Sequence, residues 1–180
     1  MTNKKFLFLN PGVLWITGLS GSGKTTISKI IINKLKKKYE NIILLDGDKL
    51  RKKLKIKSKD TFTYVERKKI GLKYSKICKK YFNSNKFVII SVMALIKDVH
   101  KWNRSNISNY KDVYLEVPMK ELKRRDPKKI YSKFEKKEIS NVAGLDLKYD
   151  IPKNSSMKIR WKKNFSAQKI AKKIINKFFN

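Results

Sequence analysis

The chain has 180 residues, of which 41% are hydrophobic, and this length and composition fit one globular domain with a sizeable core. Its 46 lysines and arginines against 14 acidic residues give a formal charge of +32. Its one cysteine excludes an internal disulfide, and its one histidine argues against a zinc site.

The positive charge by itself would favour a nucleic-acid-binding protein. Only six of the 46 basic residues are arginine, however, and the lysines are spread along the whole chain together with many Ile and Asn residues. This pattern indicates a bias of composition that leaves solvated basic faces. We therefore expect no specific nucleic-acid partner.

The opening stretch, MTNKKFLFLNPG, has a basic start and an apolar run of four residues that ends at Asn10-Pro11. Such a run is too short for a signal peptide or a membrane span. We therefore expect a cytoplasmic protein with no membrane partner.

The stretch GLSGSGKTT, residues 18–26, follows a short apolar run at 13–17 that is typical of a buried strand. It fits the pattern G-x-x-x-x-G-K-[ST], and apolar residues at helical spacing follow it through 27–35. In such a loop the backbone N–H groups cradle phosphates, the lysine reaches the β- and γ-phosphates and the hydroxyl coordinates Mg²⁺. The residues expected to bind ATP here are Gly18, Leu19, Ser20, Gly21, Ser22, Gly23, Lys24, Thr25 and Thr26.

Two aspartates follow the second predicted strand, 42–45, in the stretch LLDGDKLR. Asp46 and Asp48 can both face the phosphate site, because ligands of such sheets bind at the carboxyl ends of the strands. One would help order Mg²⁺ and the other would accept a proton from an attacking hydroxyl. We expect Lys24, Asp46 and Asp48 to be catalytic and Thr25 and Asp46 to hold the metal, with the division of roles between the two aspartates left open.

The third predicted strand, 87–90, ends at Ser91 instead of the usual aspartate. A fourth strand is predicted at 113–117, and helices at 66–82, 98–107 and 119–125, with a C-terminal helix capped by Ser166. Alternating strands and helices predict an α/β fold, a three-layer α/β/α sandwich with a parallel sheet. The phosphate-binding motif makes it a fold of the P-loop NTPase/kinase type. We expect one domain over 1–180, with a mobile lid around 126–160, where periodic apolar residues are scarce.

Five stretches together resemble the adenylylsulfate kinase family in order and approximate spacing: GLSGSGKTT, LLDGDKLR, FTYVER, RRDPKKIYSKFEKKEI and GLDLKYDIP. The resemblance runs from about Val13 to Pro152. These kinases transfer phosphate from ATP to the ribose 3′-hydroxyl of adenylyl sulfate, so the resemblance implies ATP and Mg²⁺ as cofactors and a small nucleotide as acceptor. We also expect a homodimer.

The resemblance assigns further residues to each substrate. Arg51 and Arg67 would hold the anionic part of the acceptor, and Phe62 would stack on its base. Arg125 and Lys128 would belong to the lid that closes over ATP.

Departures from the family pattern fall on the acceptor side. Ile70 stands where the family usually has asparagine, and Val142 stands where it has a second base-stacking phenylalanine. Ala94-Leu95 replaces a serine-proline pair. Adenylyl sulfate is therefore the first acceptor to consider, and another nucleotide-linked acceptor, such as a cytidine-diphosphate-linked one in surface-polysaccharide modification, is the alternative. A catalytically inactive nucleotide-binding or nucleic-acid-associated protein is a third reading.

Overall fold

The computed structural model describes residues 7–56 and 62–179, so part of the opening stretch, residues 1–6, lies outside the described residues. Five strands form one sheet in the order β2-β3-β1-β4-β5, and every neighbouring pair is parallel. The strands are β1 (Gly12–Thr17), β2 (Ile42–Asp46), β3 (Phe87–Ser91), β4 (Tyr110–Glu116) and β5 (Met157–Arg160). β1 and β3 are buried along their whole length, as their nearly continuous apolar runs predict for central parallel strands.

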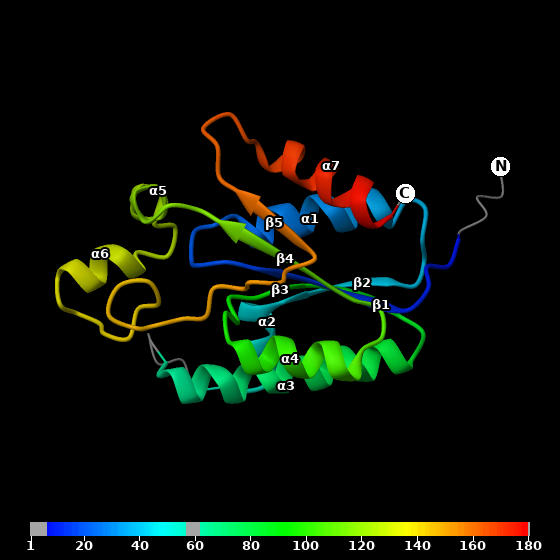
Figure 1. Ribbon diagram of the computed structural model, residues 1–180, viewed down its shortest axis with the longest axis horizontal. Coiled ribbons are helices and arrows are strands. Elements are labelled where there is room, and N and C mark those ends of the chain that lie inside the picture. Colours follow the sequence, from blue (N-terminus) through cyan, green and yellow to red (C-terminus); the bar gives the residue numbers. More distant parts are fainter. Residues whose placement is uncertain (1–6, 57–61, 180) are drawn as a thin grey trace.

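Helices cover both faces of the sheet (Figure 1). The helices are α1 (Lys24–Leu35), α2 (Gly47–Lys53), α3 (Tyr64–Asn83), α4 (Lys97–Asn106), α5 (Met119–Arg125), α6 (Ile130–Glu135) and α7 (Ala167–Phe178). On one face α1 and α7 bury Ile27, Ile31 and Ile174 against Leu14 and Ile89. On the other face, α3 and α4 bury side chains that include Cys78 and Val99. The predicted three-layer α/β/α sandwich is confirmed.

Two helix starts show how local sequence sets the element boundaries. Thr63 and Glu66 form a capping box at the start of α3, in which the Thr63 side chain accepts from the Glu66 backbone and the Glu66 carboxylate accepts from the Thr63 backbone. Ser166 caps α7 by accepting from the Lys169 backbone N–H at 3.2 Å, as predicted.

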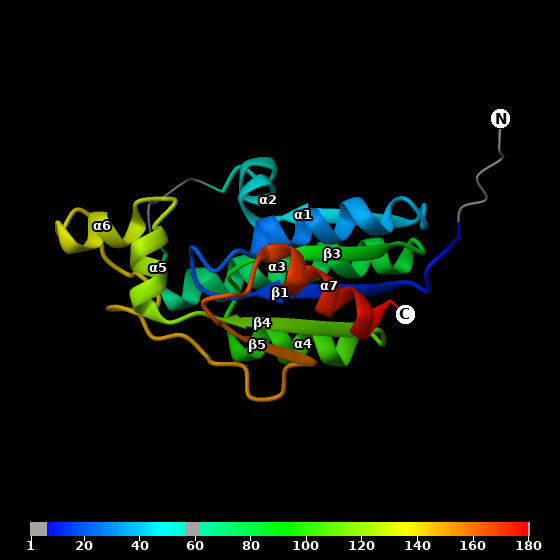
Figure 2. The ribbon, with the colours of Figure 1, turned by 90° about the horizontal axis from the view of Figure 1, so that it is seen from above.

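The segment 126–160 is more ordered in secondary structure than predicted. It contains α6, and its last four residues form the edge strand β5, which pairs with β4 from Val113↔Met157 to Glu116↔Arg160. Residues 157–160, which the sequence analysis included in the segment expected as a lid, therefore belong to the sheet. Viewed from above, α5 and α6 lie beyond the carboxyl ends of the strands (Figure 2).

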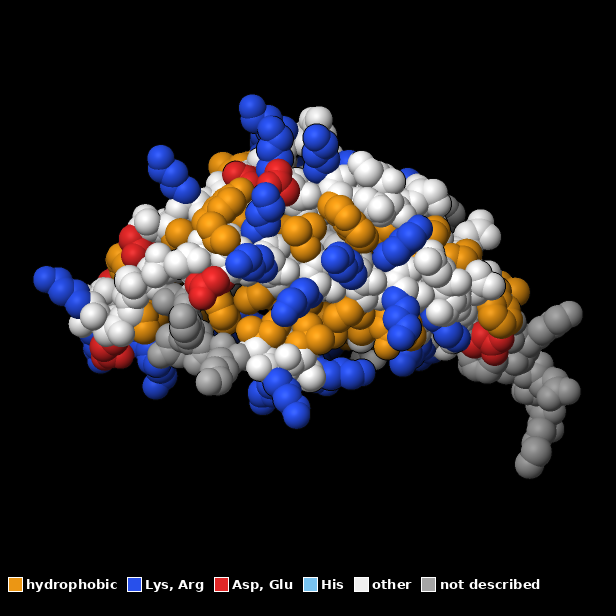
Figure 3. Space-filling model, turned by 90° about the horizontal axis from the view of Figure 1, so that it is seen from below, with side chains coloured by type: hydrophobic (Ala, Val, Ile, Leu, Met, Phe, Trp, Pro, Cys, Tyr) orange, Lys and Arg blue, Asp and Glu red, His pale blue; other side chains and the backbone are white. Residues whose placement is uncertain are grey.

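The basic residues are scattered on the face that α3 and α4 form. Figure 3 shows lysine and arginine side chains spread among hydrophobic ones on this side, with no single basic patch. In the described ranges, none of the helices combines the length and the apolar character needed to cross a membrane.

Candidate active site

A cavity of about 900 Å³ opens at the carboxyl ends of the strands, where parallel α/β sheets bind their ligands. The P-loop and the two aspartates that follow β2 line one part of it. The start of α3, the loop after β3 and the loop around Val142 line another part. Segments from both the P-loop side and the α3 side therefore line the same cavity.

The P-loop has the backbone that phosphate binding requires. Gly23 precedes α1 in a left-handed conformation with φ 91°, and no side chain caps this end of the helix. At Gly18, with φ 155°, a Cβ atom would lie 2.8 Å from the Leu115 carbonyl oxygen, so glycine is needed there. The uncapped N–H groups at the start of α1 are thus free to bind an anion.

Lys24 is held inside this loop, and none of the carboxylates in residues 7–56 and 62–179 pairs with it. Its Nζ donates to the Leu19 carbonyl at 2.7 Å and to Ser22 Oγ at 3.3 Å. Burial, followed by the positive charge of Lys128, lowers the pKa of Lys24 to about 7, against the opposing effect of the two aspartates. A half-buried cation in such surroundings favours a bound anion, and phosphate oxygens meet this requirement.

Asp46 connects the P-loop to the ends of two strands. Its Oδ2 accepts from the Thr25 hydroxyl at 3.0 Å and from the Ser91 hydroxyl at 3.1 Å. Its Oδ1 caps α2 by accepting from the backbone N–H groups of Asp48 and Lys49. Ser91, noted in the sequence only for replacing an aspartate, therefore belongs to the same site.

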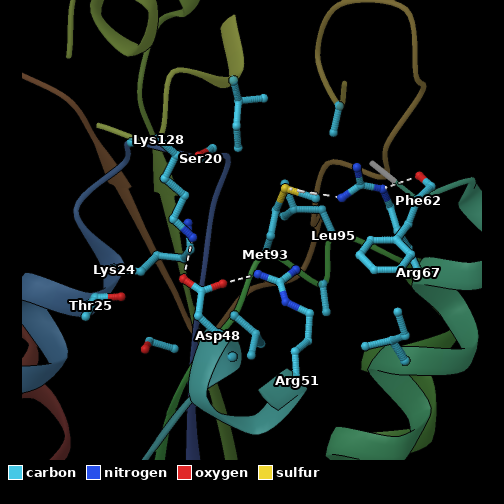
Figure 4. A pocket seen from close by; sticks show the side chains of 18 of the residues that line it. Ser20, Lys24, Thr25, Asp48, Arg51, Phe62, Arg67, Met93, Leu95 and Lys128 are labelled. Atoms are coloured by element: carbon cyan, nitrogen blue, oxygen red, sulfur yellow. Dashed lines mark hydrogen bonds and ion pairs between the residues drawn. The ribbon is translucent and has the colours of Figure 1, made fainter. Parts of the chain in front are cut away.

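Asp48 faces a different set of partners. Lys128 and Arg51 both form ion pairs with its carboxylate, one oxygen each (Figure 4). Burial acts to raise the pKa of Asp48, but the hydrogen bonds and charges of these two cations outweigh it and the pKa lies below its ordinary value. Asp48 therefore lies between the P-loop side and the arginine side of the cavity.

Two side chains from α5 and α6 contact the P-loop. Arg125 donates to the Gly21 carbonyl at 3.3 Å and to Glu121 at 2.7 Å. Tyr131, which the sequence analysis did not single out, donates from its hydroxyl to the Ser20 carbonyl at 3.0 Å. These contacts join α5 and α6 to the phosphate-binding loop.

Arg67 and Phe62 form the opposite end of the cavity together with Ile70 and Val142. The Arg67 guanidinium donates to the Phe62 carbonyl at 2.8 Å and lies against the Met93 sulfur (Figure 4). Burial, and then the charge of nearby Arg51, lowers the pKa of Arg67 to about 10. Met93 and Lys148 also line the cavity and were missed. Met93 lies in no recognised motif, and Lys148 lies in the stretch GLDLKYDIP, in which the sequence analysis assigned no residue a role.

The structure brings most of the predicted site residues together in one cavity. Those that line it are Ser20, Gly21, Gly23, Lys24, Thr25, Thr26, Asp46, Asp48, Arg51, Phe62, Arg67, Ile70, Arg125, Lys128 and Val142. Gly18, Leu19 and Ser22 are not part of the lining. Leu19 and Ser22 are buried behind it, where they hold Lys24.

An uncapped P-loop helix, a lysine inside the loop and aspartates at the carboxyl end of a parallel sheet are features of P-loop nucleotide-binding proteins, the class that includes the P-loop kinases. Residues 10–160 match the adenylylsulphate kinase family. The chain belongs to this family, and it is a nucleotide-binding phosphotransferase. The resemblance seen in the motifs is confirmed.

Individual relatives differ in their acceptors. A cytidine diphosphoramidate kinase of Campylobacter jejuni is 40% identical over 143 residues, which cover 79% of this chain and 82% of that protein. An adenylyl-sulfate kinase of Clostridium kluyveri is 33% identical over 84% of this chain and 75% of its own length. Among solved structures, the Mycobacterium tuberculosis APS kinase in complex with AMPPNP and APS superposes with a TM-score of 0.85 at 26% identity, over 95% of this chain and 99% of that one.

Proposed function

We propose that this kinase transfers the γ-phosphate of ATP to a hydroxyl of a cytidine-linked nucleotide acceptor. The observation that carries the proposal is the position of Asp48, whose carboxylate is shared by Lys128 from the lid and Arg51 from the acceptor side. A hydroxyl that meets the transferring phosphate must approach at this boundary, and a carboxylate there can accept its proton.

The donor half would bind ATP through the P-loop amides and Lys24. Thr25 and Asp46 offer a hydroxyl and a carboxylate 3.0 Å apart, and oxygen ligands of this kind fit Mg²⁺. When bound, Mg²⁺ supplies positive charge that balances the phosphate oxygens.

The chemical step is a simple displacement. The acceptor oxygen forms a bond to the γ-phosphorus, the bond between that phosphorus and the bridging oxygen of ADP breaks, and the hydroxyl proton passes to Asp48. Lys24 would stabilise the transferring phosphate. Arg125 and Lys128 would act from a lid that includes α5 and α6, since both side chains already reach toward the P-loop and Asp48.

The proposed order of the two acceptors is the reverse of the order in the sequence analysis: a cytidine-linked nucleotide comes first and adenylyl sulfate second. Phe62 and Val142 both line the cavity, so a base held between these two side chains meets one aromatic face, and Ile70 offers it no side-chain hydrogen bond. Stacking on an aromatic ring is worth about 1–3 kcal/mol, so this loss disfavours adenine more than a smaller base held by shape. The 40% identity to a cytidine diphosphoramidate kinase supports the same choice.

Adenylyl sulfate is the second candidate acceptor, favoured by the family match and by the likeness to a structure that holds APS. The experiment is a panel of acceptors, cytidine diphosphoramidate and adenylyl sulfate among them, assayed for ATP-dependent ADP release with Mg²⁺. Lys24→Ala serves as the inactive control. Release of ADP with none of these nucleotides would refute the proposal.

A further inference from the structure

Arg67 is the residue that the family resemblance assigns to the acceptor anion, but the structure commits its guanidinium to the protein. Nε donates to the Phe62 carbonyl at 2.8 Å, and Nη2 donates to the Asn141 carbonyl at 2.9 Å. Nη1 lies 3.7 Å from the Met93 sulfur. Three segments that are distant from one another in the sequence therefore contact one planar group. Figure 4 shows two of these contacts, those with Phe62 and Met93.

The backbone of Asn141, whose carbonyl binds Arg67, is also bound through its N–H group by a carboxylate. Asp146 accepts from the Asn141 backbone N–H at 2.7 Å and from the Val142 backbone N–H at 2.6 Å. Asn141 itself has a left-handed backbone with φ 59°, a conformation that costs energy for most residues and needs such support. Arg67 thus binds the carbonyl of a residue whose amide Asp146 binds.

These contacts join two segments that line the cavity, one at Phe62 and one at Val142, which we take as the two walls of the acceptor slot. Phe62 supplies the carbonyl that receives Arg67 Nε, and its buried ring lines the cavity. Val142, also buried, directly follows Asn141 in the sequence and lines the same cavity. Fixing one carbonyl on each wall fixes the separation of the walls.

We propose that Arg67 and Asp146 form a clamp that sets the width of the base slot, and that they are positioning residues for base selectivity. The inference rests on the proposed function, since it assumes a nucleotide acceptor between Phe62 and Val142. A slot of fixed width discriminates between a pyrimidine and a purine by shape. A slot with a loosened wall accepts both.

The substitution Arg67→Lys separates this role from anion binding. Arg67→Lys keeps a positive charge but cannot reach the Phe62 and Asn141 carbonyls with one rigid fork. If Arg67 only held the acceptor anion, the activities on cytidine- and adenine-linked acceptors would fall by the same factor, because both carry that anion. The clamp predicts that kcat/KM for the cytidine-linked acceptor, divided by kcat/KM for the adenine-linked one, falls toward one by about tenfold. KM for ATP should stay within about twofold of the wild-type value.

Asp146→Asn tests the clamp from the opposite wall and leaves Arg67 in place. We expect the same change in the ratio. Arg160→Lys and Asp98→Asn are matched controls, because both side chains form ion pairs outside the cavity. These two variants should keep the wild-type ratio.

Amide hydrogen exchange, measured without any acceptor present, tests whether the clamp forms. The amides of Asn141 and Val142 should be protected in the wild type and should exchange at least about tenfold faster in both Arg67→Lys and Asp146→Asn, but not in the controls. Unchanged exchange in Arg67→Lys would overturn the clamp even if no nucleotide acceptor is found. Faster exchange with an unchanged activity ratio would overturn its role in selectivity, whereas inactivity of the wild type on all acceptors would refute the proposed function instead.

Discussion

The Thr25 hydroxyl donates a hydrogen bond of 3.0 Å to Asp46 Oδ2, and this contact links the first turn of α1 to the end of β2. Asp48, two residues further on, is turned instead toward Lys128 and Arg51. The structure therefore separates the aspartates, which the sequence left interchangeable, into one beside the P-loop hydroxyl and one between the two halves of the cavity. Their substitutions should have different effects.

Asp48→Asn should reduce kcat by about 10²- to 10⁴-fold and change KM for ATP little, because the amide keeps the shape of the side chain but cannot accept the proton. Asp46→Asn should mainly raise the Mg²⁺ concentration needed for half-maximal rate, since asparagine can still cap α2. Rate measurements over a series of Mg²⁺ concentrations distinguish the two variants. An equal response of both variants to Mg²⁺ would contradict this division of roles.

Lys24→Ala should lower kcat by about a thousandfold or more and leave the fold intact. The Nζ contacts of Lys24 are to Leu19 and Ser22 of the P-loop, not to the hydrophobic core. Lys29→Ala, an exposed position on the same helix, is the matched control and should behave as wild type. Circular dichroism shows whether the variant is folded, and turnover measurements show whether it is active. A folded Lys24→Ala enzyme with normal turnover would refute the role of Lys24 in the P-loop.

Val142→Phe should shift activity toward adenine-linked acceptors. A phenylalanine that faces the base would restore the second stacking surface, and we expect KM for adenylyl sulfate to fall by about tenfold. KM for ATP should stay constant, because Val142 lies on the acceptor side. An unchanged KM for adenylyl sulfate would mean that the valine does not face the base.

His100 should make stability depend on pH below neutrality. Its ring nitrogens contact the Tyr110 hydroxyl at 2.9 Å and the Ala94 carbonyl at 3.0 Å, and burial, only partly opposed by Asp112, holds its pKa below the ordinary value of 6.5. The unfolded chain therefore binds a proton that the folded chain does not, so stability falls as the pH drops below about 6.5, by up to about 1.4 kcal/mol per pH unit.

Chemical denaturation at a series of pH values from about 7.5 to about 5.5 measures this slope, because the range extends about one unit on either side of the ordinary histidine pKa. His100→Gln removes the titrating ring and should flatten the curve in this range. The same slope in the variant would assign the effect to other groups.

Features with a local signature were predictable from the sequence. Glycine spacing fixed the position of the P-loop, and apolar runs indicated four of the five strands. Helix α2 gave no such signal, because Leu50 is its one buried residue. Strand β5 was missed for a similar reason, since Ile159 is the only buried residue among its four.

Contacts between distant segments left no trace in the sequence. Arg67 donates to a carbonyl 74 residues away in the sequence, and Lys128 donates to a carboxylate 80 residues away. No rule of sequence spacing predicts such pairs. The site residues could therefore be predicted as a set, but not their pairing. The pairing distinguishes Asp46 from Asp48 and gives Arg67 its protein partners.

The central claim is phosphoryl transfer to a cytidine-linked acceptor, and the kcat/KM ratio of cytidine diphosphoramidate to adenylyl sulfate, measured with ATP and Mg²⁺, tests it most directly. We predict a ratio of at least about ten in favour of the cytidine compound, with a phosphorylated acceptor and ADP formed in equal amounts. A ratio below one, with efficient phosphorylation of adenylyl sulfate, would contradict the account.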